Sequence, residues 1–265
     1  MKTILITGST DGVGKLTSTK LAKDGHQIIL HGRNPEKLKN TIAEIKEKSG
    51  NDKVSGFLAN LSDFDSISKM ITAISNEFSS IDILINNAGV LKINAQQNQD
   101  GLDMRFAVNY YAPYLLTNGL LPILKKSDSP RIINLSSAAQ SAVSMEALKG
   151  QEPLSEQAAY AQSKLALTMW SFAFAEAHPN IVTIALNPGS LLNTKMVKEA
   201  YGQHWSPADK GADILVELAL SEKHATSNGK YFDNDKGAFA DAHQDAYSPE
   251  KINQLISETN KIIKR

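Results

Sequence analysis

Short apolar runs alternate with longer amphipathic segments along most of this chain. This alternation is typical of successive strand–helix units that wrap around a parallel sheet with right-handed crossovers. Strands are predicted at Thr3–Thr7, Gln27–Leu30, Val54–Leu58, Ile81–Asn86, Arg131–Leu135, Ile181–Leu186 and Lys230–Phe232. Helices are predicted near Val13–Asp24, Pro35–Lys48, Phe64–Phe78, Gly101–Lys125, Ser155–His178 and Pro207–Leu220. The long segments without a strand are Ala138–Leu154 and Gly189–Ser206, and segments of that length tend to be functional.

Composition narrows the class of protein further. The chain has 265 residues with 42% hydrophobic and 21% charged residues, which is typical of a globular protein. Basic and acidic residues number 28 each, so the balance of charge predicts no attraction to nucleic acid or to an anionic membrane. Cysteine is absent, which excludes disulfides and thiolate chemistry. The first residues lack the apolar run of a signal peptide and no segment approaches about 20 apolar residues, so we expect a cytoplasmic protein.

A glycine-rich turn lies between the first predicted strand and the first helix, with the sequence Thr7-Gly8-Ser9-Thr10-Asp11-Gly12-Val13-Gly14. Glycines at this place let the backbone turn tightly and approach a pyrophosphate, and the helix N-terminus offers free N–H groups to its charge. A mononucleotide P-loop is excluded because Leu16, and no Ser or Thr, follows Gly14-Lys15. We therefore expect one domain over residues 1–265, a Rossmann-type doubly wound α/β fold with a seven-stranded parallel sheet and helices on both faces. That domain would carry both the cofactor site and the substrate site.

The end of the second strand indicates which dinucleotide is bound. It reads Leu30-His31-Gly32-Arg33-Asn34, where an NAD site usually has a carboxylate for the ribose 2′-hydroxyl. Arg33 instead offers a planar cation that matches a phosphate. NADP(H) is therefore expected in preference to NAD(H). Lys15 either adds to this positive field or is a solvated lysine.

Polar residues follow the carboxyl ends of later strands. The fourth strand ends in Asn86-Asn87-Ala88-Gly89, and the fifth in Ser136 and Ser137. The sixth strand leads into Pro188-Gly189, and Thr194 beyond it is a candidate donor to a carboxamide or a phosphate. Asn109 lies inside an apolar helical run, either as a buried structural amide or as a site residue.

Tyr160 and Lys164 stand four residues apart on one predicted helix, so the two side chains share a face. A neighbouring ammonium favours the phenolate, so we expect Lys164 to lower the pKa of Tyr160 toward neutrality.

Together these motifs resemble the short-chain dehydrogenase/reductase family, over essentially the whole chain. The segment Val143–Leu154, the residues around Tyr160 and Asn228-Gly229-Lys230-Tyr231-Phe232 resemble its retinol-dehydrogenase-like branch. The resemblance implies that Tyr160 exchanges a proton with the substrate oxygen and that Lys164 also holds the nicotinamide ribose. It further implies that Ser137, with Ser136 as the fallback, bonds the carbonyl and that Asn109 supports a water relay. The implied cofactor contacts are Gly8, Ser9, Thr10, Asp11, Gly12, Val13, Gly14, Arg33, Asn34, Asn60, Leu61, Asn87, Ala88, Gly89, Tyr160, Lys164, Pro188, Gly189 and Thr194.

The expected reaction interconverts a carbonyl and an alcohol by hydride transfer, without a metal, because the six histidines show no ligand spacing. The expected substrate is an apolar aldehyde, ketone or alcohol, since the loops supply apolar side chains that either line the site or pack on the core: Val143, Met145, Leu148, Leu191, Leu192, Met196, Tyr201 and Trp205. A non-catalytic NADP(H)-binding sensor or scaffold is the main alternative. A nucleotide-sugar epimerase or dehydratase is disfavoured by the glycine spacing.

Two predicted helices are apolar on more than one face, with Leu165, Leu167, Trp170, Phe172 and Phe174 on the second. Such helices need cover on both sides, which predicts a homodimer or homotetramer. The alternative is a monomer in which the Val143–Leu154 insertion covers this face.

Overall fold

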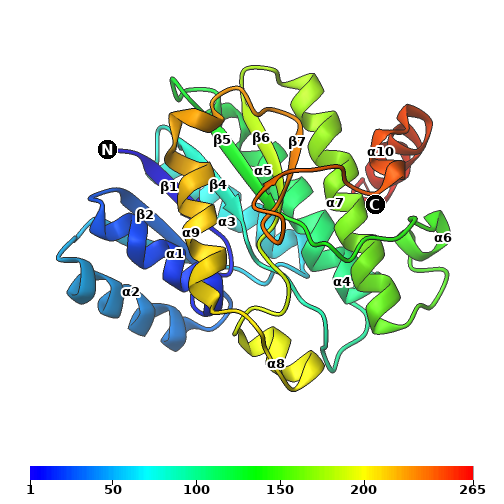
Figure 1. The fold of residues 1–265 in the computed structure, drawn as a ribbon, viewed down its shortest axis with the longest axis horizontal. Helices are drawn as coiled ribbons and strands as arrows, with labels where there is room; N and C mark the ends of the chain where they lie inside the picture. Colours follow the sequence, from blue (N-terminus) through cyan, green and yellow to red (C-terminus); the bar gives the residue numbers. More distant parts are fainter. Residues whose placement is uncertain (265) are drawn as a thin grey trace.

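The computed structural model describes residues 1–264, and in this range the strands form one eight-stranded sheet with the order β3-β2-β1-β4-β5-β6-β7-β8 (Figure 1). The strands are β1 Thr3–Ile6, β2 Gln27–Gly32, β3 Val54–Leu58, β4 Ile83–Asn86, β5 Arg131–Leu135, β6 Val182–Asn187, β7 Lys230–Asp233 and β8 Ala238–Phe239. The first seven pair in parallel, and β8 pairs antiparallel with β7. The doubly wound Rossmann-type α/β fold is confirmed, and the predicted strand number is corrected from seven to eight. The eighth strand has only two residues, too few to give an alternating pattern.

Helices and short helical turns connect these strands. The α-helices are α1 Gly12–Lys23, α2 Pro35–Ser49, α3 Phe64–Glu77, α4 Met104–Phe106, α5 Ala112–Leu124, α6 Met145–Leu148, α7 Glu156–Ala177, α8 Lys195–Tyr201, α9 Ala208–Leu220 and α10 Pro249–Ile262. The π-helix η1 spans Ala107–Tyr111, and the 3₁₀ turns η2 and η3 span Glu222–His224 and Gln244–Tyr247. No helix of residues 1–264 is long and apolar enough to cross a membrane.

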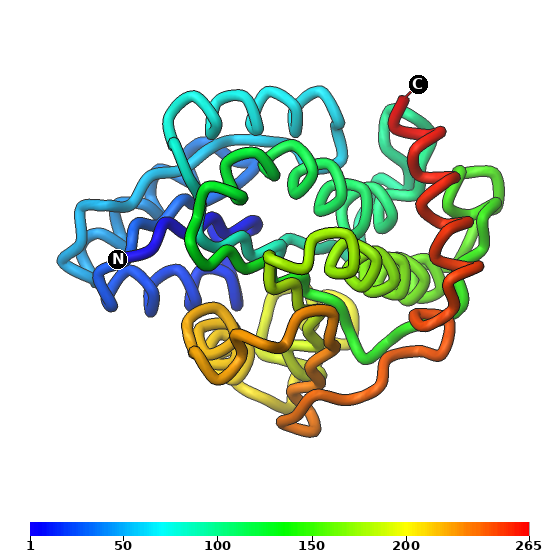
Figure 2. The backbone as a smooth tube through the Cα atoms, turned by 90° about the horizontal axis from the view of Figure 1, so that it is seen from above, coloured from blue at the N-terminus to red at the C-terminus, as the bar shows by residue number. Residues whose placement is uncertain are grey.

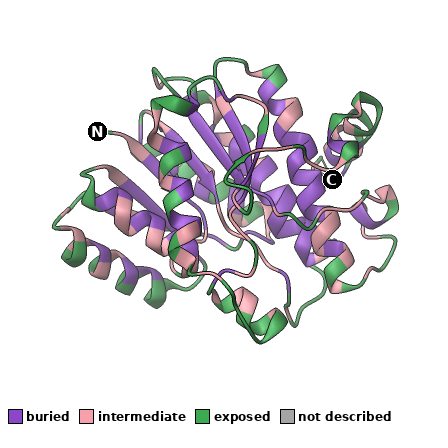
Figure 3. Ribbon diagram, viewed as in Figure 1, coloured by how far each residue is buried: buried purple, intermediate pink, exposed green. Residues whose placement is uncertain are grey.

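Alternating strand residues build two hydrophobic layers, one on each side of the sheet. Leu5, Leu84 and Ile132 face a core formed with α3, α5 and α7, whereas Ile4, Ile6 and Ile133 face a core formed with α1, α2 and α9. The central strands are buried on both faces (Figure 3), which explains why they read as continuous apolar runs in the sequence. The middle of the sheet is therefore filled by core side chains, which leaves the strand ends, the connecting loops and the flanking helices to carry functional residues.

The helix predicted at Gly101–Lys125 is interrupted. A π-turn at Ala107–Tyr111 separates α4 from α5, and the Ala112 N–H donates to the Ala107 carbonyl five residues earlier. Pro113 explains the wider turn, because proline has no N–H for the carbonyl of Asn109 and its ring crowds that group. Such π-turns often occur at functional sites. Asn109 lies at the centre of this one.

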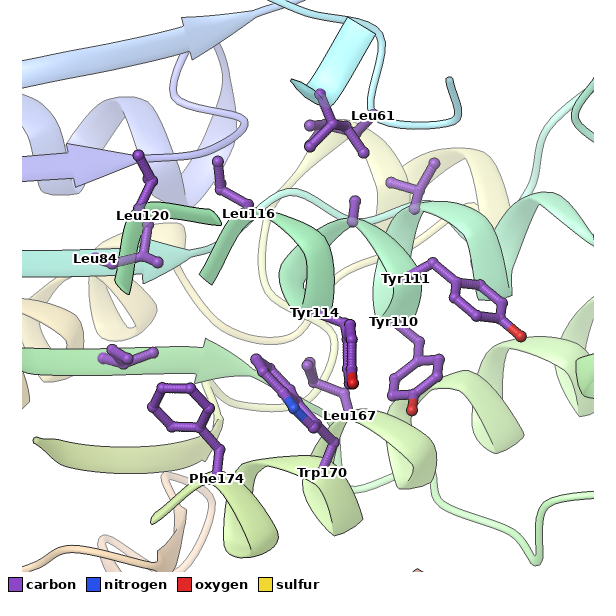
Figure 4. Packing of buried hydrophobic residues seen from close by; sticks show 14 of the residues in the cluster. Leu61, Leu84, Tyr110, Tyr111, Tyr114, Leu116, Leu120, Leu167, Trp170 and Phe174 are labelled. Atoms are coloured by element: carbon purple, nitrogen blue, oxygen red, sulfur yellow. The ribbon is translucent and has the colours of Figure 1, made fainter. Parts of the chain in front are cut away.

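The C-terminal helix α10 covers the outer side of α7 and η1 (Figures 1 and 2). Tyr110 and Thr259 share a hydrogen bond of 2.7 Å, and the Tyr114 hydroxyl donates to Asn260 at 2.8 Å. Tyr114 also packs against Trp170, which stacks with Phe174 at a centroid distance of 5.5 Å (Figure 4). The second apolar face is thus covered largely by α10 of the same chain. It no longer requires a partner subunit, and the homo-oligomer stays a prediction.

Candidate functional site

The predicted site residues gather at the carboxyl ends of the parallel strands. The turn after β1 contacts the end of β4, since Asn87 Nδ2 donates to the carbonyls of Thr7 and Gly8 at 2.8 and 3.1 Å. The Ala88 N–H donates to the Thr7 hydroxyl at 3.0 Å. The Asn87 side chain therefore holds the glycine-rich turn against the end of β4, and its Nδ2 donates to backbone carbonyls of that turn.

Two glycines of this turn are required by close packing. Gly8 has a φ of +64°, and a Cβ there would lie 2.8 Å from the Ala88 Cα. A Cβ at Gly14 would lie 2.6 Å from the Gly8 carbonyl oxygen and would collide with Asn87. Asp11 caps α1 by accepting from the Gly12 N–H, while Val13 is buried in the core beneath.

His31 and Ser9 connect the glycine-rich turn to β2 by hydrogen bonds. His31 Nδ1 accepts from the Gly8 N–H at 3.0 Å, and its Nε2 lies 3.1 Å from the Ala59 carbonyl oxygen. Burial lowers the pKa of His31 to about 4, so the ring is neutral and Nε2 is the donor. Ser9 is fully buried and bonds the backbone of His31, so its side chain supports the turn from inside.

Basic side chains surround the end of β2. Arg33 is exposed there, and Asn34 caps α2 by accepting from the Lys37 N–H at 2.8 Å. The Lys37 ammonium lies 2.6 Å from Asp11, beside the glycine-rich turn. Lys15 forms an ion pair with Glu44 at 2.6 Å. Sequence reasoning missed Lys37, although its place in the first turn of α2 was a signal.

Thr10 and the residues after β3 lie beside the end of β2. A Cβ on Gly32 would touch the Thr10 methyl at 2.6 Å, so Thr10 abuts the residue before Arg33. Asn60 is exposed and its Oδ1 accepts from Ser62, while Leu61 is buried.

Three of the four predicted catalytic residues are joined near Gly89. A Cβ on Gly89 would lie 3.3 Å from Asn109 Oδ1 and 3.4 Å from Lys164 Nζ. Asn109 accepts from the Val90 N–H at 2.8 Å and donates to Ser163 Oγ at 3.0 Å. The Lys164 ammonium is buried, donates to the Leu135 carbonyl at 2.6 Å and lies 5.6 Å from the Tyr160 ring centroid.

The two neighbouring serines have different surroundings. The Ser136 hydroxyl is buried against α7, where it donates to the Lys164 carbonyl at 3.0 Å and pairs with Thr168 at 2.7 Å. The Ser137 hydroxyl interacts with the Tyr160 phenol and acts to lower its pKa. Of the two serines, Ser137 is therefore the one whose hydroxyl contacts Tyr160.

The predicted lowering of the pKa of Tyr160 is wrong for this structure. Burial raises the pKa of the phenol above its ordinary value of 10.0, the hydrogen bond with Ser137 offsets part of that rise, and Tyr201 adds to it. Burial also lowers the pKa of Lys164 to about 7. Lys164 thus carries only part of a positive charge at neutral pH, because desolvation disfavours its charged form.

Helix α8 and the turn before it lie over the site. The Pro188 carbonyl accepts from Asn234 at 2.9 Å, the Gly189 N–H donates to Asn187 Oδ1 at 3.3 Å, and Thr194 caps α8. A cleft of about 430 Å³ separates α8 from the glycine-rich turn, with the lining residues Asp11, Gly12, Asn193, Thr194, Lys195, Lys198 and Glu199. The apolar loop residues divide: Leu148 and Leu192 are buried in the core, whereas Tyr201 and Trp205 are exposed.

The carbonyl of Ser137 has two donors that sequence reasoning did not assign. Tyr231 donates its hydroxyl proton to this carbonyl at 3.0 Å, and Gln140 Nε2 donates at 2.9 Å. Gln140 Oε1 in turn accepts from the His243 N–H at 3.1 Å, near the C-terminal helix. The Asn228–Phe232 motif marked Tyr231 in the sequence, but only the fold brings it to Ser137.

Known proteins share this architecture and these motifs. The short chain dehydrogenase family profile matches residues 2–205. Human retinol dehydrogenase 13 is 34% identical, with 88% of this chain and 76% of that protein covered, and human polyprenol dehydrogenase is 31% identical with the same coverage. Among solved structures, a short chain dehydrogenase from Escherichia coli CFT073 complexed with NADPH shares 25% identity at a TM-score of 0.74, covering 88% of this chain and 96% of that one. The chain belongs to the short-chain dehydrogenase/reductase family, as an oxidoreductase of its retinol-dehydrogenase-like branch.

Proposed function

We propose that the protein is an NADP(H)-dependent oxidoreductase that interconverts an apolar aldehyde or ketone and the corresponding alcohol, with Tyr160 as the acid/base. The observation that carries the proposal is the place of Tyr160 beside Ser137 and the buried Lys164, whose Nζ lies 5.6 Å from the Tyr160 ring centroid. A hydroxyl pair next to a buried cation is the arrangement that a carbonyl oxygen needs as it gains a proton.

The residues around the cleft fit a dinucleotide. Gly8 and Gly14 allow the turn to pack tightly against Ala88 and Asn87, and Gly12 at the α1 N-terminus lines the cleft. Gly89 lets the backbone pass close to Lys164 and Asn109. We propose that the glycine-rich turn and Thr194 hold the diphosphate and that Tyr160 and Lys164 hold the nicotinamide ribose. When bound, the nicotinamide supplies the hydride.

The protein side of the reaction follows from these contacts. In reduction, Ser137 donates a hydrogen bond to the carbonyl oxygen, and Tyr160 transfers its phenolic proton to that oxygen as the alcohol forms. A raised pKa keeps Tyr160 protonated at neutral pH, which suits a proton donor. Lys164 then stabilises the phenolate, and Asn109 joins the loop after β4 to α7 through its hydrogen bonds to Val90 and Ser163.

A preference for NADP(H) over NAD(H) rests on the positive charge at the end of β2. Arg33 and Lys37 lie there, on either side of the α2 N-terminus. Two structural relatives at 25% and 27% identity are complexed with NADPH and NADP, respectively. Arg33→Ala is expected to weaken NADPH binding far more than NADH binding, as measured by fluorescence titration. Equal losses of affinity for NADPH and NADH would show that Arg33 does not bind the 2′-phosphate.

An apolar substrate fits the loops around the site. Val143 and Met145 are partly buried beside the core, and Tyr201 and Trp205 are exposed on the segment that covers the cleft. The relatives named for polyprenol and retinol dehydrogenation act on apolar alcohols according to their names. We include long-chain and isoprenoid aldehydes among the expected substrates for these reasons.

A panel of carbonyl compounds with NADPH and with NADH, followed by the loss of reduced-cofactor absorbance, tests the proposal. Wild type is expected to turn over apolar aldehydes or ketones, and Tyr160→Phe to lose at least about 100-fold in kcat while still binding NADPH. Tyr247→Phe is the matched control, since Tyr247 is exposed and belongs to η3. Full activity of Tyr160→Phe would contradict the assigned acid/base.

The sensor or scaffold alternative predicts NADPH binding without turnover by any compound of the panel. A single domain over residues 1–265, a cytoplasmic location and a homo-oligomer stay predictions. Limited proteolysis, cell fractionation and light scattering test them in turn.

A further inference from the structure

Arg105 is the largest fully buried side chain of the described residues, and it lies outside the four predicted catalytic positions. A buried guanidinium is costly unless every donor finds a partner. Here Nε donates to the Leu91 carbonyl at 2.9 Å, and NH1 donates to Gln96 Oε1 at 2.7 Å. NH1 also pairs with Asp103 at 3.1 Å, and NH2 pairs with Glu156 at 2.9 Å.

These partners come from three different parts of the fold. Leu91 and Gln96 belong to the loop after β4, Asp103 caps the same α4 helix, and Glu156 is the first residue of α7. Gln96 Nε2 also lies 3.3 Å from the same Glu156 oxygen. Figure 1 shows α4 beside the first turns of α7. Arg105 therefore joins the loop after Gly89 to the start of the helix that carries Tyr160.

A second set of polar contacts joins this part of the chain to α7, one helical turn after the contact between Arg105 and Glu156. Asn109 is four residues after Arg105, and Tyr160 is four residues after Glu156, so each pair shares a helix face. Asn109 Nδ2 donates to Ser163 Oγ at 3.0 Å, and Ser163 donates to the Tyr160 carbonyl at 2.7 Å. The Arg105–Glu156 contact thus fixes the register in which Asn109 faces Ser163, whose hydroxyl bonds the Tyr160 carbonyl.

We propose that Arg105, acting through Glu156, is a positioning residue that sets the place of Tyr160 relative to Asn109 and to the loop after Gly89. The inference rests on the proposed function for its catalytic consequence. Lysine cannot replace this arginine, because an ammonium lacks the planar fork that reaches Leu91, Gln96 and Glu156 together.

The matched control is Arg131, a second buried arginine. Its NH1 donates to the Leu218 and Ser221 carbonyls at 3.0 and 2.7 Å, at the end of α9. Arg131 begins β5, at the end of the strand opposite to Ser137. Arg131→Lys should therefore destabilise the fold without moving Tyr160.

The experiment compares Arg105→Lys, Glu156→Gln, the double variant and Arg131→Lys, each as the full chain. Arg105→Lys is expected to lower kcat by about 10-fold while the Kd for NADPH changes less than about two-fold. Both substitutions break the same contact between Arg105 and Glu156. The kcat of the double variant should therefore be no more than about two-fold below that of Arg105→Lys. Hydrogen exchange of the amides in residues 156–163 should accelerate in Arg105→Lys by more than its loss of unfolding free energy explains, and in Arg131→Lys by no more than that loss explains.

Two results would overturn the proposal: a kcat in Arg105→Lys equal to that in Arg131→Lys, or exchange in residues 156–163 of Arg105→Lys that accelerates no more than its loss of unfolding free energy explains. If wild type turns over no carbonyl compound, the proposed function fails, and the exchange rates then decide the positioning role by themselves.

Discussion

The buried charge of Lys164 is predicted to lower the free energy of unfolding of this protein. The ammonium is 4% exposed, and its pKa falls from 10.5 to about 7 because burial disfavours the charge. The folded pKa lies below the unfolded one, so the cost of burial grows as the pH falls from 10.5 toward 7. At 1.36 kcal/mol per pKa unit, this cost is about 4 kcal/mol at pH 7 and about 1 kcal/mol at pH 9.5.

Lys164→Met keeps the apolar stem and removes the charge. It also removes the hydrogen bond to the Leu135 carbonyl, which contributes about 1 kcal/mol at either pH. The variant without cofactor should therefore be more stable than wild type by about 3 kcal/mol at pH 7 and about equally stable at pH 9.5. NADPH should raise its Tm less than that of wild type, because the proposed donor to the ribose is gone.

Urea denaturation followed by circular dichroism at the two pH values measures this difference, with Lys39→Met on the exposed side of α2 as control. A stability difference that is the same at pH 7 and pH 9.5 would refute the reasoning, because it would mean that Lys164 keeps an ordinary pKa in the folded protein.

Three further predictions concern the supports of the site. The pKa of His31 falls from 6.5 to about 4 on folding, so about 3 kcal/mol of unfolding free energy should be lost as the pH drops from 6.5 to 4. In urea denaturation, the unfolding free energy of His31→Gln should therefore depend less on acid pH than that of wild type. The same dependence in both proteins would contradict the assignment. Tyr231→Phe removes one of two donors to the Ser137 carbonyl, so kcat should fall by about 3- to 10-fold with the Kd for NADPH unchanged, in steady-state kinetics and fluorescence titration. Gly14→Ala places a methyl group against Asn87 and the Gly8 carbonyl, so calorimetry should show loss of NADPH binding together with a lower Tm; retained binding would mean that the turn can relax.

Local patterns in the sequence were enough for the parallel sheet and most of its helices. Buried strands need continuous apolar runs, and Asn34-Pro35 and Gly50 mark the ends of α2 by capping chemistry that acts within one turn. The glycine-rich turn and the Tyr160–Lys164 spacing were equally local. These features predicted the fold class, the family and the set of candidate site residues before any contact was known.

Properties that depend on residues far apart in the sequence were decided only by the tertiary structure. Burial, which no local spacing reports, reversed the predicted direction of the pKa of Tyr160. Ser136 and Ser137 are adjacent in sequence, but packing against Thr168 directs one hydroxyl into α7 and leaves the other to Tyr160. The roles of α10, Tyr231 and Arg105 likewise arise from contacts between segments far apart in the chain, because the free energy of a buried polar group depends on partners that only the fold supplies.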